Sequence, residues 1–236
     1  MPWTEAKTRT ECEAEFGRIT RLDFSMPNGT TEDYVTLGPH LAAYQAGRVT
    51  RLLALFEMSD QYGMTGFPVS RFEHGLQTAT LAHRAGKDEE YVVCALLHDA
   101  GECIVFDNHA EIGAEILRPF ISDANYWMMR HHSFFQMYHM GEHLGVDRNM
   151  REQWRGHEHF ERTLEFCDRF DALGFNPMHQ GMPLEFFRPM VERVVNKTGD
   201  TAIAAMMPDA VLSAGDSVFR ILATDRRRVQ NASGNA

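Results

Sequence analysis

The sequence has little of what membrane, secreted or nucleic-acid-binding proteins need. No stretch approaches the roughly 18 consecutive apolar residues of a membrane-spanning helix. The first residues lack a basic stretch followed by an apolar run, so we expect no secretion signal. Basic residues are scarce, since 23 Lys and Arg stand against 33 Asp and Glu. Phosphate binding needs clustered cations, and we interpret the one basic run, Arg226–Arg228, as a solvated tail feature. We predict a cytoplasmic protein that binds neither membrane nor nucleic acid.

Cysteine is also scarce, and its spacing excludes a zinc ribbon. The four cysteines form no Cys-x-x-Cys pair. Cys94, Cys103 and Cys167 stand among apolar neighbours, and we expect them to act as small core residues in a reducing compartment. Histidine is the abundant exception, with 12 residues. That number directs attention to metal binding or proton transfer.

The chain shows helical periodicity and almost no strand-like alternation, which predicts an all-α fold. At 236 residues, one sizeable domain is sufficient. We predict that this domain spans 36–197, between an N-terminal arm (1–35) and a weakly ordered C-terminal tail (198–236). Asn108 and Glu111 have the spacing of a capping box at the start of a helix. The predicted helices cover approximately 41–62, 70–85, 88–101, 108–117, 122–138, 158–173 and 184–195.

A His98-Asp99 pair follows an apolar run and precedes Gly101, which fits a helix C-cap. Both side chains would then sit in the last turn of a helix, where they can leave the core and converge. By itself such a pair is often simply exposed. His74 belongs to a partly buried helix, where a single histidine is more often a core residue than a ligand. His109 is expected in the first turn of its helix.

Two further choices stay open on spacing alone. His132 shares a helical face with apolar residues, whereas His131 lies on the side of Trp127. Asp171 falls on the apolar stripe of its helix, whereas Asp168 is turned away from it. A carboxylate directed at a core is costly unless it is paired with a charge or bound to a metal.

The order of His74, His98-Asp99 and Asp171 resembles the signature of the HD superfamily, a helical fold in which His…His-Asp…Asp binds a divalent metal. The resemblance covers roughly residues 40–195. Two additional histidines resemble the dinuclear branch, in which the aspartate of the pair bridges both metals. The resemblance implies an all-α HD-domain helical bundle around a buried two-metal site, with catalytic roles for Asp99 and His132. The implied ligands are His74, His98, Asp99, His109, His132 and Asp171.

Within that branch, two oxygenase families resemble parts of the chain. The segment 130–135 with His139 is similar to a stretch of the myo-inositol oxygenases and favours His132 as the ligand. The segment 169–171 resembles their Lys-Phe-Asp and favours Asp171. The segments 73–78, 109–114 and 183–185 resemble hydroxyphosphonate-cleaving oxygenases. Both families use a mixed-valent pair of iron ions (Fe²⁺/Fe³⁺) and O2, although four imidazoles and two carboxylates also suit Mn, Ni, Zn or Mg.

The departures concern the substrate. Glu102 and Phe175 stand where inositol oxygenases carry lysines, and Gln136 stands where the hydroxyphosphonate enzymes carry one. A carboxylate at Glu102 would disfavour an anionic substrate and favour an amine or a neutral polyol. The expected substrate contacts are Tyr62, Glu102, Arg130, Ser133, Gln136 and His139.

The leading hypothesis is therefore a diiron oxygenase that uses O2 to cleave a small polar hydroxylated substrate. The alternative is a metal-dependent HD-type phosphohydrolase acting on a phosphate ester or nucleotide. Basic residues are sparse near the motifs, which disfavours the alternative, but Arg71, Arg130 and Arg155 could anchor a phosphate. A third possibility is a non-catalytic sensor or structural protein that kept its metal residues.

Overall fold

The computed structural model describes residues 43–197, and every regular element in that range is helical, as predicted. The predicted arm and tail lie outside the described residues, so these domain boundaries stay a prediction. The α-helices are α4 (Arg48–Tyr62), α5 (Arg71–Arg84), α6 (Glu89–Leu97), α7 (His109–Leu117), α8 (Asp123–Leu144), α9 (Phe160–Phe166) and α10 (Leu184–Asn196). The described part also contains two short 3-10 helices (Arg118–Phe120 and Met150–Trp154) and a π-helix (Cys167–Asp171).

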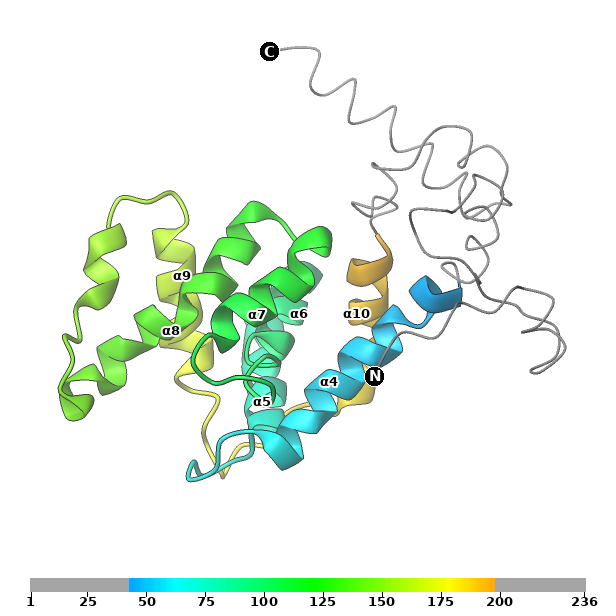
Figure 1. Ribbon diagram of the computed structural model, residues 1–236, viewed down its shortest axis with the longest axis horizontal. Helices are drawn as coiled ribbons and strands as arrows, with labels where there is room; N and C mark the ends of the chain where they lie inside the picture. The colour runs from blue at the N-terminus through cyan, green and yellow to red at the C-terminus, as the bar shows by residue number, and fades with distance from the viewer. Residues whose placement is uncertain (1–42, 198–236) are drawn as a thin grey trace, which may run out of the picture. The chain divides into compact units, whose positions relative to one another are not determined.

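Helix α6 forms the centre of the core. Every residue from Tyr91 to Leu97 is buried, as expected for a helix that is covered on all sides. Helix α5 packs along α6, α10 also packs against α6, and α7 pairs with α8, which in turn contacts α9 (Figure 1). Helix α4 joins the same core through Phe56, whose ring lies 4.9 Å from that of Phe72. The carboxyl end of α6 therefore delivers the next two residues, His98 and Asp99, into the interior.

Side-chain caps fix where three of these helices begin. Ser70 and Glu73 form a reciprocal capping box at the start of α5. Asp88 caps α6, and Ser122 caps α8 through its hydroxyl. Each such cap is worth about 1 kcal/mol. They set the rotation of the first turns, including the turn of α5 that carries His74.

One predicted helix cap and one predicted helix boundary are wrong, although α7 (His109–Leu117) begins and ends as expected. Asn108 makes no side-chain cap, because its backbone (φ −132°, ψ 31°) is not in the extended conformation that an N-cap needs. Gly101 is not a left-handed C-cap, since α6 already ends at Leu97 and Gly101 has no positive φ. It is required by close packing instead. A Cβ at Gly101 would lie 2.6 Å from the carbonyl oxygen of His109 and 2.9 Å from the Cβ of Ile112.

The helix predicted over 158–173 is interrupted, and the helix predicted to end near residue 138 is longer. Helix α9 ends at Phe166, and the chain continues as a π-helix in which Ala172 N donates to Cys167 O at 2.9 Å. A π-turn widens the helix by one residue and is frequent at functional sites. Helix α8 continues to Leu144 and ends at Gly145, whose φ of 74° is left-handed.

The structure bears on the expected burial of the cysteines. Cys94 and Cys167 are buried, as predicted, while Cys103 is half-buried and Cys12 lies outside the described residues. None of the helices within 43–197 combines the length and apolar character that crossing a membrane would require.

Candidate metal centre

The structure brings together the six side chains that the sequence predicts as metal ligands. They come from five elements that pack around the end of α6. Five of the six are buried, and the His109 side chain is 14% exposed. The six are His74 on α5, His98 and Asp99 after α6, His109 at the start of α7, His132 within α8, and Asp171 at the end of the π-helix.

One group, which we name subsite A, consists of His74, His98 and Asp171. The Nε2 atoms of the two histidines are 3.2 Å apart. The Oδ1 atom of Asp171 lies 3.2 Å from His74 Nε2 and 3.5 Å from His98 Nε2. Three potential ligand atoms thus surround one small space, which is compact enough for a single ion.

A second group, subsite B, consists of His109 and His132, and Asp99 lies between the two groups. Asp99 Oδ1 is 3.1 Å from His132 Nε2 and 3.4 Å from His109 Nε2. The other oxygen, Oδ2, is 3.4 Å from His98 Nε2 and 3.6 Å from His74 Nε2. One carboxylate therefore faces both subsites with different oxygens, an arrangement suited to two neighbouring cations.

The four histidines share one orientation. In each ring Nδ1 lies within hydrogen-bond distance of a backbone carbonyl, and since a carbonyl only accepts, Nδ1 carries the hydrogen. In the neutral ring every Nε2 then presents a lone pair to the interior, the form in which histidine binds metals. The pairs are His74 with Gly174 (3.1 Å), His98 with Ala95 (2.9 Å), His109 with Phe106 (2.7 Å) and His132 with Met129 (2.6 Å).

The interior of the site consequently consists of acceptors that face one another. Asp171 Oδ2 is buried and has no hydrogen-bond partner within the part of the chain that the structure describes. Facing lone pairs and carboxylates repel one another unless cations lie between them, and an unpaired buried carboxylate oxygen is costly. The residues present thus fit divalent metals, and their mixed nitrogen and oxygen donors suit iron, manganese, nickel or zinc.

Without metal, the electrostatics of the centre favour protons. Burial lowers the pKa of His98, but the Asp99 and Asp171 carboxylates outweigh burial and raise it to about 9. Burial also opposes the charged form of His109, yet its hydrogen bond to Asp99 raises the pKa of that ring. The two carboxyls respond in the opposite sense. Burial raises the pKa of each, and the surrounding histidines overcome it and hold both below the usual range.

An arginine completes the wall of subsite A. Arg71 is buried, its Nη1 lies 3.5 Å from Asp99 Oδ2, and its Nε lies 2.8 Å from Glu102 Oε2. Phe175 stacks on His74 with ring centroids 3.8 Å apart and an interplanar angle of 12°. The sequence suggested Arg71 only as a phosphate anchor, and Phe175 only as a position lacking a lysine. Neither contact with the ligands could be inferred from spacing.

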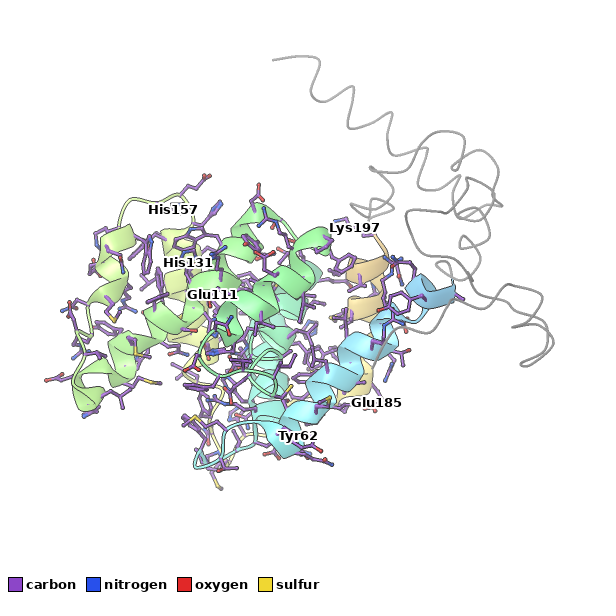
Figure 2. All side chains as sticks on the ribbon, in the orientation of Figure 1. Tyr62, Glu111, His131, His157, Glu185 and Lys197 are labelled. Atoms are coloured by element: carbon purple, nitrogen blue, oxygen red, sulfur yellow. The ribbon has the colours of Figure 1, made fainter. Side chains whose placement is uncertain are left out.

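The predicted substrate contacts are not all placed at the centre. Ser133 is close, with Oγ 3.3 Å from His109 Nε2, and Gln136 is buried one turn beyond His132 on α8. Glu102 is buried and turned toward Arg71. The other three contact different regions or solvent. Tyr62 is 64% exposed at the end of α4 (Figure 2), Arg130 contacts Tyr126 and Glu115 near the surface, and His139 contacts Asp168.

The alternatives that spacing left open occupy different surroundings. His131 stacks on Trp127 with ring centroids 4.1 Å apart, and His157 stacks on the same indole at 4.4 Å. Asp168 accepts a hydrogen bond from Arg151 at 3.0 Å and is partly exposed. Neither side chain belongs to subsite A or B, where His132 and Asp171 lie instead.

The comparison with protein families agrees with this geometry. Residues 71–173 match the family model described as HD domain, which begins at Arg71 and ends just beyond Asp171. This part of the chain is an HD domain. The match contains all six side chains of the two subsites, so the family's region and the structural centre coincide.

Two curated relatives of the chain are dioxygenases by name. A [1-hydroxy-2-(trimethylamino)ethyl]phosphonate dioxygenase (glycine-betaine-forming) from Leisingera caerulea is 31% identical over 106 residues, covering 40% of this chain and 54% of that protein. A hydroxymethylphosphonate dioxygenase from Gimesia maris is 31% identical over 88 residues, covering 31% of this chain and 44% of that protein. The match thus spans about half the length of either relative.

Proposed function

We propose that the protein is a diiron oxygenase that uses O2 to cleave a small polar substrate bearing a hydroxyl group. The observation that carries the proposal is the position of Asp99, whose two oxygens face different pairs of histidines. Two similar proteins are named phosphonate dioxygenases, which favours oxygen chemistry over hydrolysis. When bound, a mixed-valent iron pair would activate O2 for reduction by electrons from the substrate, while the protein supplies position and environment.

The six ligands divide unequally between the two proposed ions. Subsite A would use His74, His98 and Asp171 together with one oxygen of Asp99. Subsite B would use His109 and His132 with the other oxygen. Subsite B thus offers three protein atoms against four in A, and a site with fewer protein ligands has more room for a substrate hydroxyl. It is also where Ser133 lies, 3.3 Å from His109.

The roles of the surrounding side chains follow from their positions. We assign Ser133 and Gln136 to hydrogen bonding with the substrate, since both lie on α8 beside His132. Their task is to hold the bond to be broken near the reacting centre and to keep water out. Arg71 is the cation in contact with the ligands, and Glu102 already pairs with it. This pairing favours neutral or cationic hydroxylated compounds over phosphonates as substrates.

The test begins with protein purified without oxygen, loaded with iron and partly oxidised. We expect a coupled Fe(II)/Fe(III) signal in electron paramagnetic resonance that hydroxylated candidate substrates perturb, and consumption of the substrate only when O2 is present. His132→Ala should abolish consumption. His131→Ala, one residue away on the same helix, is the matched control and should retain it.

Two outcomes would overturn the proposal. Hydrolysis of phosphate esters or nucleotides without O2, by protein that holds zinc or magnesium, would establish the phosphohydrolase alternative. Iron-loaded protein that binds two ions but transforms no hydroxylated compound would indicate a sensor or structural role.

A further inference from the structure

Arg71 is held in one position from several directions. It is the first residue of α5, directly after the Ser70 cap. Its guanidinium carbon lies 4.4 Å from the centre of the Phe67 ring and 5.2 Å from that of Phe175. A Cβ on Gly63 would come within 2.7 Å of the Arg71 side chain, so the turn after α4 packs closely along it. Such confinement leaves the guanidinium little freedom, and its Nη1 faces Asp99 Oδ2 at 3.5 Å.

Glu102 fixes the same guanidinium from its other edge. Arg71 Nε lies 2.8 Å from Oε2 and 3.0 Å from Oε1 of Glu102. The backbone N–H of Met64 donates to Oε1 at 2.7 Å. Both charged side chains are buried, so their attraction is screened weakly by solvent. Glu102 thus both orients Arg71 and cancels its charge beside a carboxylate proposed to bind cations.

We propose that Arg71 and Glu102 form a positioning pair for Asp99. Arg71 holds Oδ2 so that the carboxylate faces both subsites, and Glu102 prevents the arginine charge from opposing the ions. The inference rests on the proposed two-metal centre but not on its reaction. Removing only Glu102 should therefore weaken metal binding more than removing both partners, because the single change leaves a cation unpaired beside the centre.

The experiment measures binding of Mn²⁺ to metal-free full-length protein by equilibrium dialysis, with free and bound metal quantified. Glu102→Gln retains an acceptor for Met64 and loses the charge. We expect it to weaken binding at both subsites by about 10–100-fold, the usual effect of changing a residue that supports metal ligands. The double variant Arg71→Met with Glu102→Gln should bind more tightly than Glu102→Gln and less tightly than the wild type. Arg84→Met, an exposed arginine on the same helix, is the control and should match the wild type.

The order of affinities separates this role from a merely structural one. A loss of the ion pair that only loosened the fold would make the double variant at least as weak as Glu102→Gln, and that result would overturn charge cancellation. A double variant equal to the wild type would overturn the positioning role. Wild-type protein that binds two Mn²⁺ ions, with Glu102→Gln unchanged, would refute the pair and leave the two-metal centre intact. Wild-type protein that binds fewer would refute both. Thermal unfolding of each metal-free variant checks that it is folded.

Discussion

Subsites A and B are built from the same kinds of side chain, but their surroundings differ. In subsite A, His74 and His98 are fully buried, Phe175 covers one ring, and Arg71 reaches the shared carboxylate. In subsite B, His109 is partly exposed and stands just after an exposed apolar stretch, 104–106. Buried ligands that are held in position by neighbouring side chains suit an ion that stays bound. Accessible ligands suit an ion that a substrate can reach.

The difference originates in where the ligands lie along the chain. Subsite A draws on the buried end of α6 and on a π-helix that packs against α5. His109 follows a turn rather than a buried helix, and the Ser133 hydroxyl is its polar neighbour. Identical residue types thus acquire different accessibility, which is why we assign retention of metal to A and substrate access to B. The following predictions test that contrast.

Asp99→Ala should remove the contrast altogether, because this side chain faces both subsites. We expect the loss of both metal ions and of all turnover. Metal analysis after dialysis against a weak chelator measures this. Asp107→Ala, an exposed aspartate in the loop that follows, should retain both ions. Two ions bound to the Asp99 variant would contradict the shared position.

Asp171→Ala and His109→Ala should each affect mainly one subsite. The first removes a carboxylate from subsite A, and the second removes an imidazole from subsite B. Each should therefore lower the affinity for one ion by at least about 10–100-fold. Competition with a chelator resolves the two dissociation steps. Asp171→Ala should lower the affinity for the more tightly bound ion, and His109→Ala the affinity for the more weakly bound one. The reverse assignment would contradict the contrast.

The metal-free protein should lose stability as the pH rises. Because the folded pKa of His98 is about 9 and its ordinary value is 6.5, its contribution is fully present below pH 6.5 and is lost as the pH rises through about 9. The expected loss is about 3 kcal/mol in the free energy of unfolding. The depressed carboxyls act at the other end, since their contribution is lost only in acid. Urea unfolding with chelator present, across pH 6.5–9, measures the slope.

Metal should reverse that trend, because ions displace the protons from the histidines. Affinity for Mn²⁺ should therefore rise over the same pH range. A stability of the metal-free protein that stays level while metal affinity rises would show that His98 is neutral without metal.

Two glycine substitutions should also distinguish the subsites, with smaller effects on metal binding. A Cβ at Gly174 would collide with Thr78 and come within 2.9 Å of His74 Nδ1, beside A. A Cβ at Gly101 would collide with the backbone of His109, beside B. We expect each alanine variant to cost about 1–3 kcal/mol in stability and to weaken mainly its own subsite. Thermal unfolding and chelator competition measure the two effects. If either variant lowered the affinity for both ions equally, the substitution would have distorted the whole centre rather than one subsite.

The smallest effect is expected for the alternatives that spacing had left open. His131→Ala and Asp168→Ala should leave the content of both ions unchanged, because these side chains contact Trp127 and Arg151 rather than the subsites. Metal analysis beside His132→Ala and Asp171→Ala provides the comparison. Loss of an ion from either of the first two variants would reopen the choice.

Local pattern was enough for most of the helices. The apolar run before His98 and the helical periodicity predicted the all-α fold and placed α5 and the start of α6 closely. The predictions failed where backbone geometry depends on distant contacts. Asn108 has capping-box spacing but a non-extended backbone, and Gly101 is fitted to α7 rather than to a left-handed turn.

For the centre, the sequence by itself determined which residue types are available, and its resemblance to HD domains selected six of them. Tertiary structure decided which oxygen of Asp99 faces which histidines and how the π-helix places Asp171. It also decided the pairing of Arg71 with Glu102, 31 residues apart. The physical reason is that periodicity reports the face of one helix. The orientation of a ring is set by backbone carbonyls such as those of Gly174 and Met129, which any residue type can supply.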